Sequence, residues 1–222
     1  PTVQAMVYGL IFGVLMARDR PENFIPFLFT GVFLFTFISG SATSGATALT
    51  SNTGLVRSLA FPRVLLPVSA VIRQFLNTLP QLGLLLITLV LFQQGITWNW
   101  LLLVPTVALM SVFNLGLAMI MARITVHVQD LNKLVPFITR IMFYVSGVFF
   151  SVEKIFQSDN VFAKLIQLNP IFDFLNLARG YLVNGYAVRA EEWIAPLIWS
   201  FAMLILGFVF FWSAEERYGR ED

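Results

Sequence analysis

The stretch Asn52–Pro67, NTGLVRSLAFPRVLLP, organises the rest of the chain, because it is a basic interruption between two long apolar runs. Pro62 and Pro67 prevent a continuous helix through it, since proline lacks an amide donor and clashes with the preceding turn. Asn52 or Thr53 is suited to cap a short helix that Pro62 then stops. Apolar residues at three- and four-residue spacing share one face of that helix: Leu55, Val56, Leu59 and Ala60.

This short helix has two interpretations. A basic helix with one apolar face, placed between two membrane spans, is suited to dock onto a soluble partner. The simpler alternative is an ordinary loop in which Arg57 and Arg63 keep the segment at the membrane surface. Short amphipathic matches are common, so on spacing alone the simpler alternative has the greater weight.

Composition places the chain among integral membrane proteins. Of its 222 residues, 58% are hydrophobic and 12% are charged, whereas a soluble domain has about a quarter charged residues. The absence of Cys excludes disulfides and thiolate metal sites, and the single histidine, His127, argues against a histidine zinc site. The net charge of +2 does not suggest nucleic-acid binding. The prediction is an all-α integral membrane protein.

Six apolar segments are predicted to span the membrane, within one transmembrane domain over residues 1–222. They are Pro1–Ala17, Asn23–Thr50, Val64–Gln94, Trp100–Ile124, Val135–Ser151 and Glu191–Trp212. Trp98 and Trp100, in the turn before the fourth span, match an aromatic belt at the membrane surface. The first span begins abruptly, so we expect a further segment upstream of Pro1.

The region before the last span contains two apolar segments that are too short to cross a bilayer, Asn160–Leu168 and Ile171–Val183. The second has a well-marked helix start, with Asn169 as the cap, Pro170 at the first position and Asp173 in the first turn. Two short helices between spans predict a re-entrant hairpin buried against protein. The alternative is a pair of interfacial helices on the outer surface.

The second half of the second span is made of small residues, SGSATSGATALTS over Ser39–Ser51. Small residues let helix backbones approach closely, and their hydroxyls can bond back to carbonyls of the same helix. The run therefore predicts tight packing against a neighbouring helix. A polar wall facing a glycan is the alternative.

Basic residues are unequally shared between the short loops. The loops Asn52–Arg63 and Arg123–Lys133 each contain two of them, whereas the opposing turns contain only Arg18 and Arg20. The positive-inside rule places the first pair of loops in the cytoplasm. With six spans, both termini are then cytoplasmic.

Several functional classes lack their residues. No G-x-x-x-x-G-K-[ST] phosphate loop occurs, so the chain has no ATP site of that type. No pair of carboxylates lies within a span and no convincing repeat is seen, which argues against a proton-coupled secondary transporter. The single histidine, in a predicted loop, argues against a hydrolase.

Three stretches together resemble the membrane subunit of type-two ABC exporters, in the branch that exports polysaccharides such as O-antigen, capsule, teichoic acid and galactan. They are NTGLVRSLAFPRVLLP at Asn52–Pro67, VQDLNKLVPFITRIMFYVSGVFFSVEKI at Val128–Ile155, and LNPIFDFLNLARGYLVNG at Leu168–Gly185. Two residues depart from the family pattern, since Gln129 replaces a common Arg and Gly147 replaces a common Pro.

The resemblance implies a homodimer of six-span subunits in the bacterial cytoplasmic membrane, with an amphipathic helix before the first span. Each subunit would bind a nucleotide-binding ATPase subunit that carries ATP and Mg, while this chain holds no cofactor and has no enzymatic activity of its own. The family's cytoplasmic coupling helix carries over onto Asn52–Phe61 and its outer re-entrant gate onto Asn160–Val183. The implied coupling residues are Asn52, Leu55, Val56, Arg57, Leu59, Phe61 and Arg63, and the implied gate residues are Asn169, Pro170, Asp173 and Arg179.

The substrate implied is a glycan attached to a polyprenyl lipid, and aromatic rings suit its path because the C–H faces of sugars stack on them. The candidate path residues are Phe33, Phe37, Tyr144, Phe149 and Phe150. The alternative for each is a phenyl or phenol ring in the core or facing membrane lipids. Two rival functions stay open, an exporter of the same architecture for a drug, haem or lipid, and a membrane-embedded enzyme or scaffold.

Overall fold

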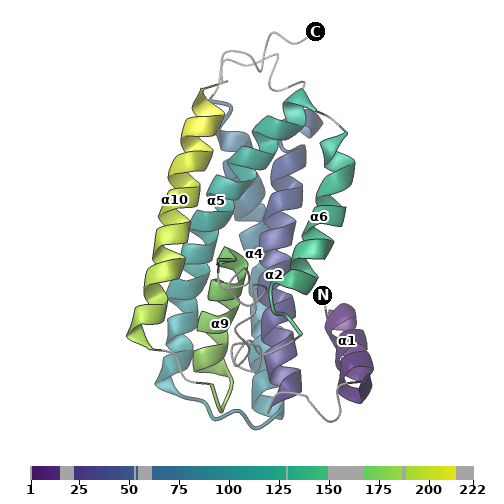
Figure 1. The fold of residues 1–222 in the computed structure, drawn as a ribbon, viewed down its shortest axis with the longest axis vertical. Coiled ribbons are helices and arrows are strands. Elements are labelled where there is room, and N and C mark those ends of the chain that lie inside the picture. Colours follow the sequence, from purple (N-terminus) through teal and green to yellow (C-terminus); the bar gives the residue numbers. More distant parts are fainter. Residues whose placement is uncertain are drawn as a thin grey trace. The chain divides into compact units, whose positions relative to one another are not determined.

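The computed structural model describes residues 2–15, 23–52, 54, 62–128, 130–149, 168–186 and 189–213, and within them every regular element is helical (Figure 1). The α-helices are α1 (Thr2–Leu15), α2 (Phe24–Thr47), α4 (Leu65–Leu91), α5 (Leu103–His127), α6 (Leu131–Val145), α9 (Pro170–Leu182) and α10 (Ile194–Trp212). Three short 3₁₀ turns accompany them, η1 (Thr50–Asn52), η2 (Trp98–Leu102) and η3 (Ala190–Trp193). The all-helical prediction is confirmed for this part of the chain.

Four described segments are long and apolar enough to cross a membrane, and each overlaps a predicted span. They are Phe24–Thr47, Leu65–Leu91, Trp98–His127 and Ala190–Trp212. The helices in the other two predicted spans are shorter, with 14 residues in α1 and 15 in α6, against about 20 for a full crossing. The count of six spans therefore stays a prediction.

The predicted bounds of the fifth span differ from those of α6. The helix begins at Leu131, four residues earlier than expected, so that Pro136 lies inside it. Asp130 immediately precedes the helix. A negative charge at this position stabilises the helix, because it lies near the positive, amino-terminal end of the helix dipole. The helix ends at Val145, and Gly147 follows with φ 70°, a left-handed conformation typical of a residue just past a helix end.

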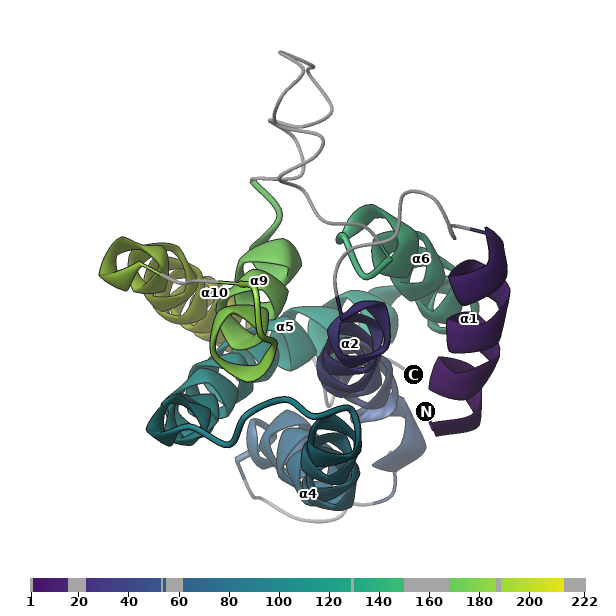
Figure 2. The same ribbon diagram turned by 90° about the horizontal axis from the view of Figure 1, so that it is seen from below.

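The described residues belong to two compact units. The first comprises Pro1–Thr36, Thr78–Ala108 and Ile141–Pro196, and the second comprises Phe37–Asn77, Leu109–Arg140 and Leu197–Asp222. In the first unit, α9 (Figure 2) lies largely in the core, with Phe174, Leu175 and Ala178 fully buried. Several long helices, α2 among them, contribute residues to both units.

The small-residue half of α2 packs tightly in the second unit. A Cβ on Gly45 would overlap the main chain of Ala118 in α5. The hydroxyl of Thr125 donates to the carbonyl of Ala46 at 2.5 Å, and that of Thr43 bonds back to Ser39 of its own helix at 2.9 Å. These contacts support the tight-packing interpretation of this run.

Three connecting segments of the first unit are tied together by one glutamine. Gln94 is buried, and its Nε2 donates to Oδ1 of Asn23 at 3.1 Å while its Oε1 accepts from the main-chain N–H of Asn184 at 2.7 Å. Asn23 completes the set by donating from Nδ2 to the carbonyl of Asn184 at 2.9 Å. The start of α2 and the segments just past the ends of α4 and α9 are thereby held to one another.

Replacing Gln94 by Leu removes these bonds and a third from Nε2 to the carbonyl of Phe92, and each such bond contributes about 0.5–1.5 kcal/mol. We expect a lower melting temperature of the purified protein in detergent. The matched control is Asn99→Leu, because Asn99 lies nearby on η2 and is exposed. Equal melting temperatures for the two variants would show that this cluster contributes nothing to stability.

Candidate functional site

The start of α9 has the capping predicted for it. Oδ1 of Asn169 accepts from the main-chain N–H of Ile171 at 3.0 Å, Pro170 occupies the first helical position and Asp173 lies in the first turn. The same Asn169 donates from Nδ2 to Oγ of Ser146 at 2.9 Å. One side chain therefore both starts α9 and attaches it to the segment after α6.

Arg179 attaches the other end of α9 to two neighbouring elements. Its Nη1 donates to the carbonyl of Gly147 at 2.9 Å, its Nη2 to the carbonyl of Val148 at 3.0 Å, and its Nε to the carbonyl of Phe27 at 3.3 Å. The guanidinium carbon lies 3.5 Å from the centroid of the Phe27 ring. Arg179 is only 1% exposed, so these carbonyls and the ring face offset the cost of burying its charge.

The space for this guanidinium depends on a glycine of α2. A Cβ built on Gly31 would overlap Nη2 of Arg179 and would press on the side chain of Val148. Since three main-chain acceptors hold the guanidinium in place, it has little freedom to move aside. Gly31 is therefore part of the Arg179 site.

The four predicted gate residues thus lie on or just before one helix, and Arg179 and Asn169 contact the segment after α6. The partners that sequence reasoning missed are Phe27, Gly31, Gly147 and Val148. A signal was present for Gly147, a glycine at a position where the family commonly has proline. The first segment of the predicted hairpin lies outside the described residues, apart from Leu168.

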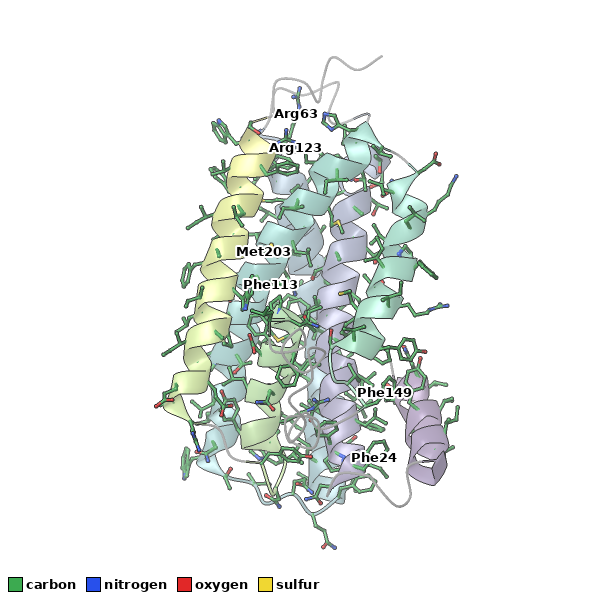
Figure 3. All side chains as sticks on the ribbon, in the orientation of Figure 1. Phe24, Arg63, Phe113, Arg123, Phe149 and Met203 are labelled. Atoms are coloured by element: carbon green, nitrogen blue, oxygen red, sulfur yellow. The ribbon has the colours of Figure 1, made fainter. Side chains whose placement is uncertain are left out.

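Two of the candidate path residues belong to an aromatic cluster in the first unit, which consists of Tyr8, Phe35, Phe143, Tyr144 and Phe149. Phe149 (Figure 3) is nearly buried, with its ring 5.2 Å from that of Tyr8, 5.1 Å from Phe143 and 5.7 Å from Tyr144. Tyr144 is 46% exposed. The cluster joins α1, α2 and α6, and Tyr144 is its exposed member.

The other candidates for the path are placed differently. Phe33 and Phe37 are fully buried, with Phe33 packing edge-on against Phe29 and Phe37 lying 6.3 Å from Phe75 between ring centroids. Phe150 lies outside the described residues. The part of the path assigned to these three side chains stays a prediction.

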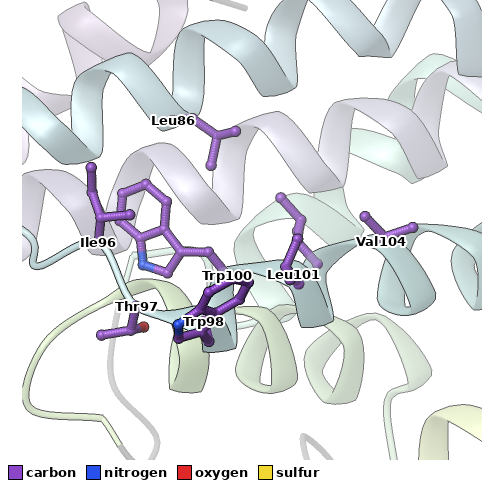
Figure 4. Close-up of a pocket in the computed structure, with 8 residues that line it drawn as sticks. Leu86, Ile96, Thr97, Trp98, Trp100, Leu101 and Val104 are labelled. Carbon is purple, nitrogen blue, oxygen red and sulfur yellow. The ribbon is translucent and has the colours of Figure 1, made fainter.

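A groove of about 450 Å³ opens beside the turn that precedes α5 (Figure 4). It is lined mainly by apolar side chains: Leu86, Ile96, Thr97, Trp98, Trp100, Leu101, Leu103 and Val104. Trp98 is 87% exposed, as expected for a tryptophan at a membrane surface. An apolar surface of this kind suits the acyl chains of lipid.

Most of the coupling segment is outside the described residues, which include Asn52 and Gly54 but none of Leu55, Val56, Arg57, Leu59 and Phe61. Its flanks are described. Asn52 closes η1, and its Nδ2 donates to the carbonyl of Ala48 at 2.8 Å, while Arg63 (Figure 3) lies in the turn before α4. Residues of both flanks share a buried core in the second unit with α5 and α10: Ala48, Leu49, Leu66, Ala70, Met119, Ala122 and Phe211.

Comparison with known proteins gives consistent matches over most of the chain. Residues 1–183 match the family described as ABC-2 type transporter. The O-antigen export system permease protein RfbA of Myxococcus xanthus is 29% identical over 218 residues, which is 98% of this chain and 80% of that protein. A protein of the same name from Klebsiella pneumoniae is 27% identical over 220 residues, covering 98% of this chain and 83% of its own length.

Two glycines of the first unit give a matched test of the Arg179 site. We expect Gly31→Ala to destabilise the purified protein by about 1–3 kcal/mol, because the added methyl overpacks the guanidinium. Gly83→Ala, in α4 with open space around its Cβ, is expected to stabilise by about 0.5–1 kcal/mol through helix propensity. The measurement is thermal unfolding in detergent, and a Gly31→Ala protein as stable as Gly83→Ala would contradict the assignment.

Proposed function

Because the chain belongs to the ABC-2 type transporter family, we propose that it is the permease subunit of an ATP-driven exporter of lipid-linked polysaccharide. The observation that carries this proposal is the similarity, over 98% of the chain, to two proteins named as O-antigen export permeases. The composition agrees with it, since 58% of the residues are hydrophobic. The location proposed is the bacterial cytoplasmic membrane.

The proposed architecture has six spans, with α1 and α6 completing the set begun by the four longer segments. Two copies form the transport unit, and a polyprenyl-linked glycan moves between them. Support comes from the hydrophobicity of the short helices: α1 is apolar over Thr2–Ile11, and α6 has exposed apolar side chains such as Phe137 and Ile141. Such side chains are suited to contact lipid or a second subunit.

The energy for transport is proposed to come from a separate ATPase subunit that binds ATP and Mg, because this sequence has no phosphate loop. Asn52–Phe61 is proposed to dock on that subunit from the cytoplasm through its apolar face. The buried core shared by both flanks of this segment supports a mechanical role. A displacement of the segment would be passed to the helices whose ends form that core.

The gate is proposed to lie in the first unit, together with the described path candidates other than Phe37, which belongs to the second unit. Arg179 holds α9 against α2 and the segment after α6, so movement of any of the three elements requires its bonds to break or to move together. Among the candidate path residues, Tyr144 has the best-suited placement, because it is exposed and stacks on the buried ring of Phe149. The C–H faces of sugars stack on such rings without requiring an exact alignment of sugar and ring.

The coupling role is tested by placing charges on the apolar face of the docking segment. In cells whose own copy is deleted, we expect the double variant Leu55→Asp and Leu59→Asp to reduce surface polysaccharide at least tenfold. The same variant should lose the co-purifying ATPase subunit. Burying two carboxylates against an apolar partner is unfavourable, which is the physical reason for both effects.

The matched control is Ser58→Asp, which adds a charge to the same segment outside its apolar face. This variant is expected to export within about twofold of the unmodified chain, since an exposed charge changes little. Undiminished export by the double variant would rule out coupling through this face. Export without any attached ATPase would rule out the proposed function as a whole.

A further inference from the structure

Within the second unit, α5 and α10 are joined by contacts that recur along both helices. On α5 the contacts involve Leu109, Gly116 and Arg123, which are seven residues apart, or about two helical turns. The first is a hydrogen bond in which Oγ of Ser200 donates to the carbonyl of Leu109 at 3.0 Å. Recurrence at this spacing keeps one face of α5 against α10.

The middle contact is an approach of two backbones. A Cβ on Gly116 would overlap the carbonyl of Met203 (Figure 3), and a Cβ on Gly207 would lie 2.7 Å from Cα of Gly116. Only glycine fits at either position, since real side chains do not make such contacts. Helices that meet in this way gain packing over a large area, and they have little room to rotate against each other.

The third contact is made by Arg123, whose side chain crosses to the carboxyl-terminal end of α10 (Figure 3). Its Nη1 donates to the carbonyl of Phe210 and, at 2.6 Å, to Oγ of Ser213. The guanidinium carbon lies 3.8 Å from the centroid of the Phe210 ring. The carbonyl of Phe210 is among the last four of the helix, which lack partners within it and favour a cation.

This end of the helix pair is continuous with the flanks of the coupling segment. Phe211, next to the residue that Arg123 contacts, is 1% exposed and belongs to the core that contains Leu49 and Leu66. Met119 and Ala122 of α5 belong to the same core. Both α5 and α10 therefore share a core with the residues that precede and follow the segment proposed to bind the ATPase.

We propose that Arg123 is a positioning residue that joins α5 and α10 into one rigid strut. The strut receives the displacement of the coupling segment through the shared core and carries it along both helices together. This inference rests on the proposed function. It also extends the proposed function. The coupling segment is directly continuous in sequence only with α2 and α4, whereas the strut makes α5 and α10, the fourth and sixth predicted spans, move with them.

The first test compares transport with ATP consumption. We expect Arg123→Gln to lower the amount of polysaccharide exported per ATP hydrolysed at least fivefold while the ATPase subunit stays bound. The reason is that α10 no longer follows the displacement of α5 when the joint between them is weakened. Arg123→Lys, which keeps a cation and a donor, should restore at least half of the ratio. Arg140→Gln, which changes an exposed arginine of α6 in the same unit, is the control and should leave the ratio unchanged. A normal ratio for Arg123→Gln would overturn the proposal.

The second test measures whether the two helices move together. The chain has no cysteine, so spin labels can be placed at His127→Cys and Val209→Cys, both at exposed positions near the ends of α5 and α10. In the complex with its ATPase subunit, we expect the distance between the labels to change by less than about 2 Å when ATP is trapped. A change above about 5 Å would disprove a rigid strut. Addition of Arg123→Gln should broaden the distance distribution, with or without nucleotide.

These readouts separate failure of the strut from failure of the proposed function. If the unmodified chain exports no polysaccharide with ATP, the proposed function is wrong, and the broadening caused by Arg123→Gln still reports on the joint between α5 and α10. If the unmodified chain exports normally while the label distance changes with ATP, the function stands and the strut is wrong.

Discussion

The constraint on which this structure depends is that a polar group shielded from water needs its partners within the chain. Arg179 is fully buried, Arg123 is half-buried, and both find their acceptors on the main chain. Arg179 binds the carbonyls of Gly147 and Val148, just past the end of α6, and Arg123 binds the carbonyl of Phe210 near the end of α10. Each guanidinium also lies over a phenyl ring. The carbonyls left over at helix ends thus supply the acceptors, and each charge holds together elements that are distant in sequence.

Close approach of helices is the second consequence of the same environment. Lipid does not drive apolar helices together, so packing area and internal hydrogen bonds have to do so. The chain provides them through glycines where backbones or a guanidinium come near, as at Gly31, Gly116 and Gly207. Longer side chains would separate the elements at these points, and the polar contacts beside them would be lost. In each unit, small residues therefore lie close to an arginine whose side chain joins two elements.

Local features could be predicted from the sequence, and distant contacts could not. The apolar segments and the capped start of α9 at Asn169 were predicted, because helix periodicity and capping involve residues a few positions apart. The acceptors of Arg179 were not, since Phe27 is 152 residues away in sequence. The start of α6 was placed too late, because Lys133 was assigned to the preceding loop although the helix includes it. The interpretation of Asn52–Phe61 came from resemblance, which local patterns alone could not supply.

A permease that has no nucleotide site of its own has to receive mechanical work from the cytoplasm, and the segment between α2 and α4 is the proposed point of entry. The most direct measurement is the side of the membrane from which this segment is reached. A single cysteine introduced by Ser58→Cys, in a chain that otherwise has none, can be reacted with a membrane-impermeant maleimide. Labelling in inside-out vesicles but not in intact spheroplasts is the expected result. Labelling of intact spheroplasts would contradict the orientation and the coupling role together.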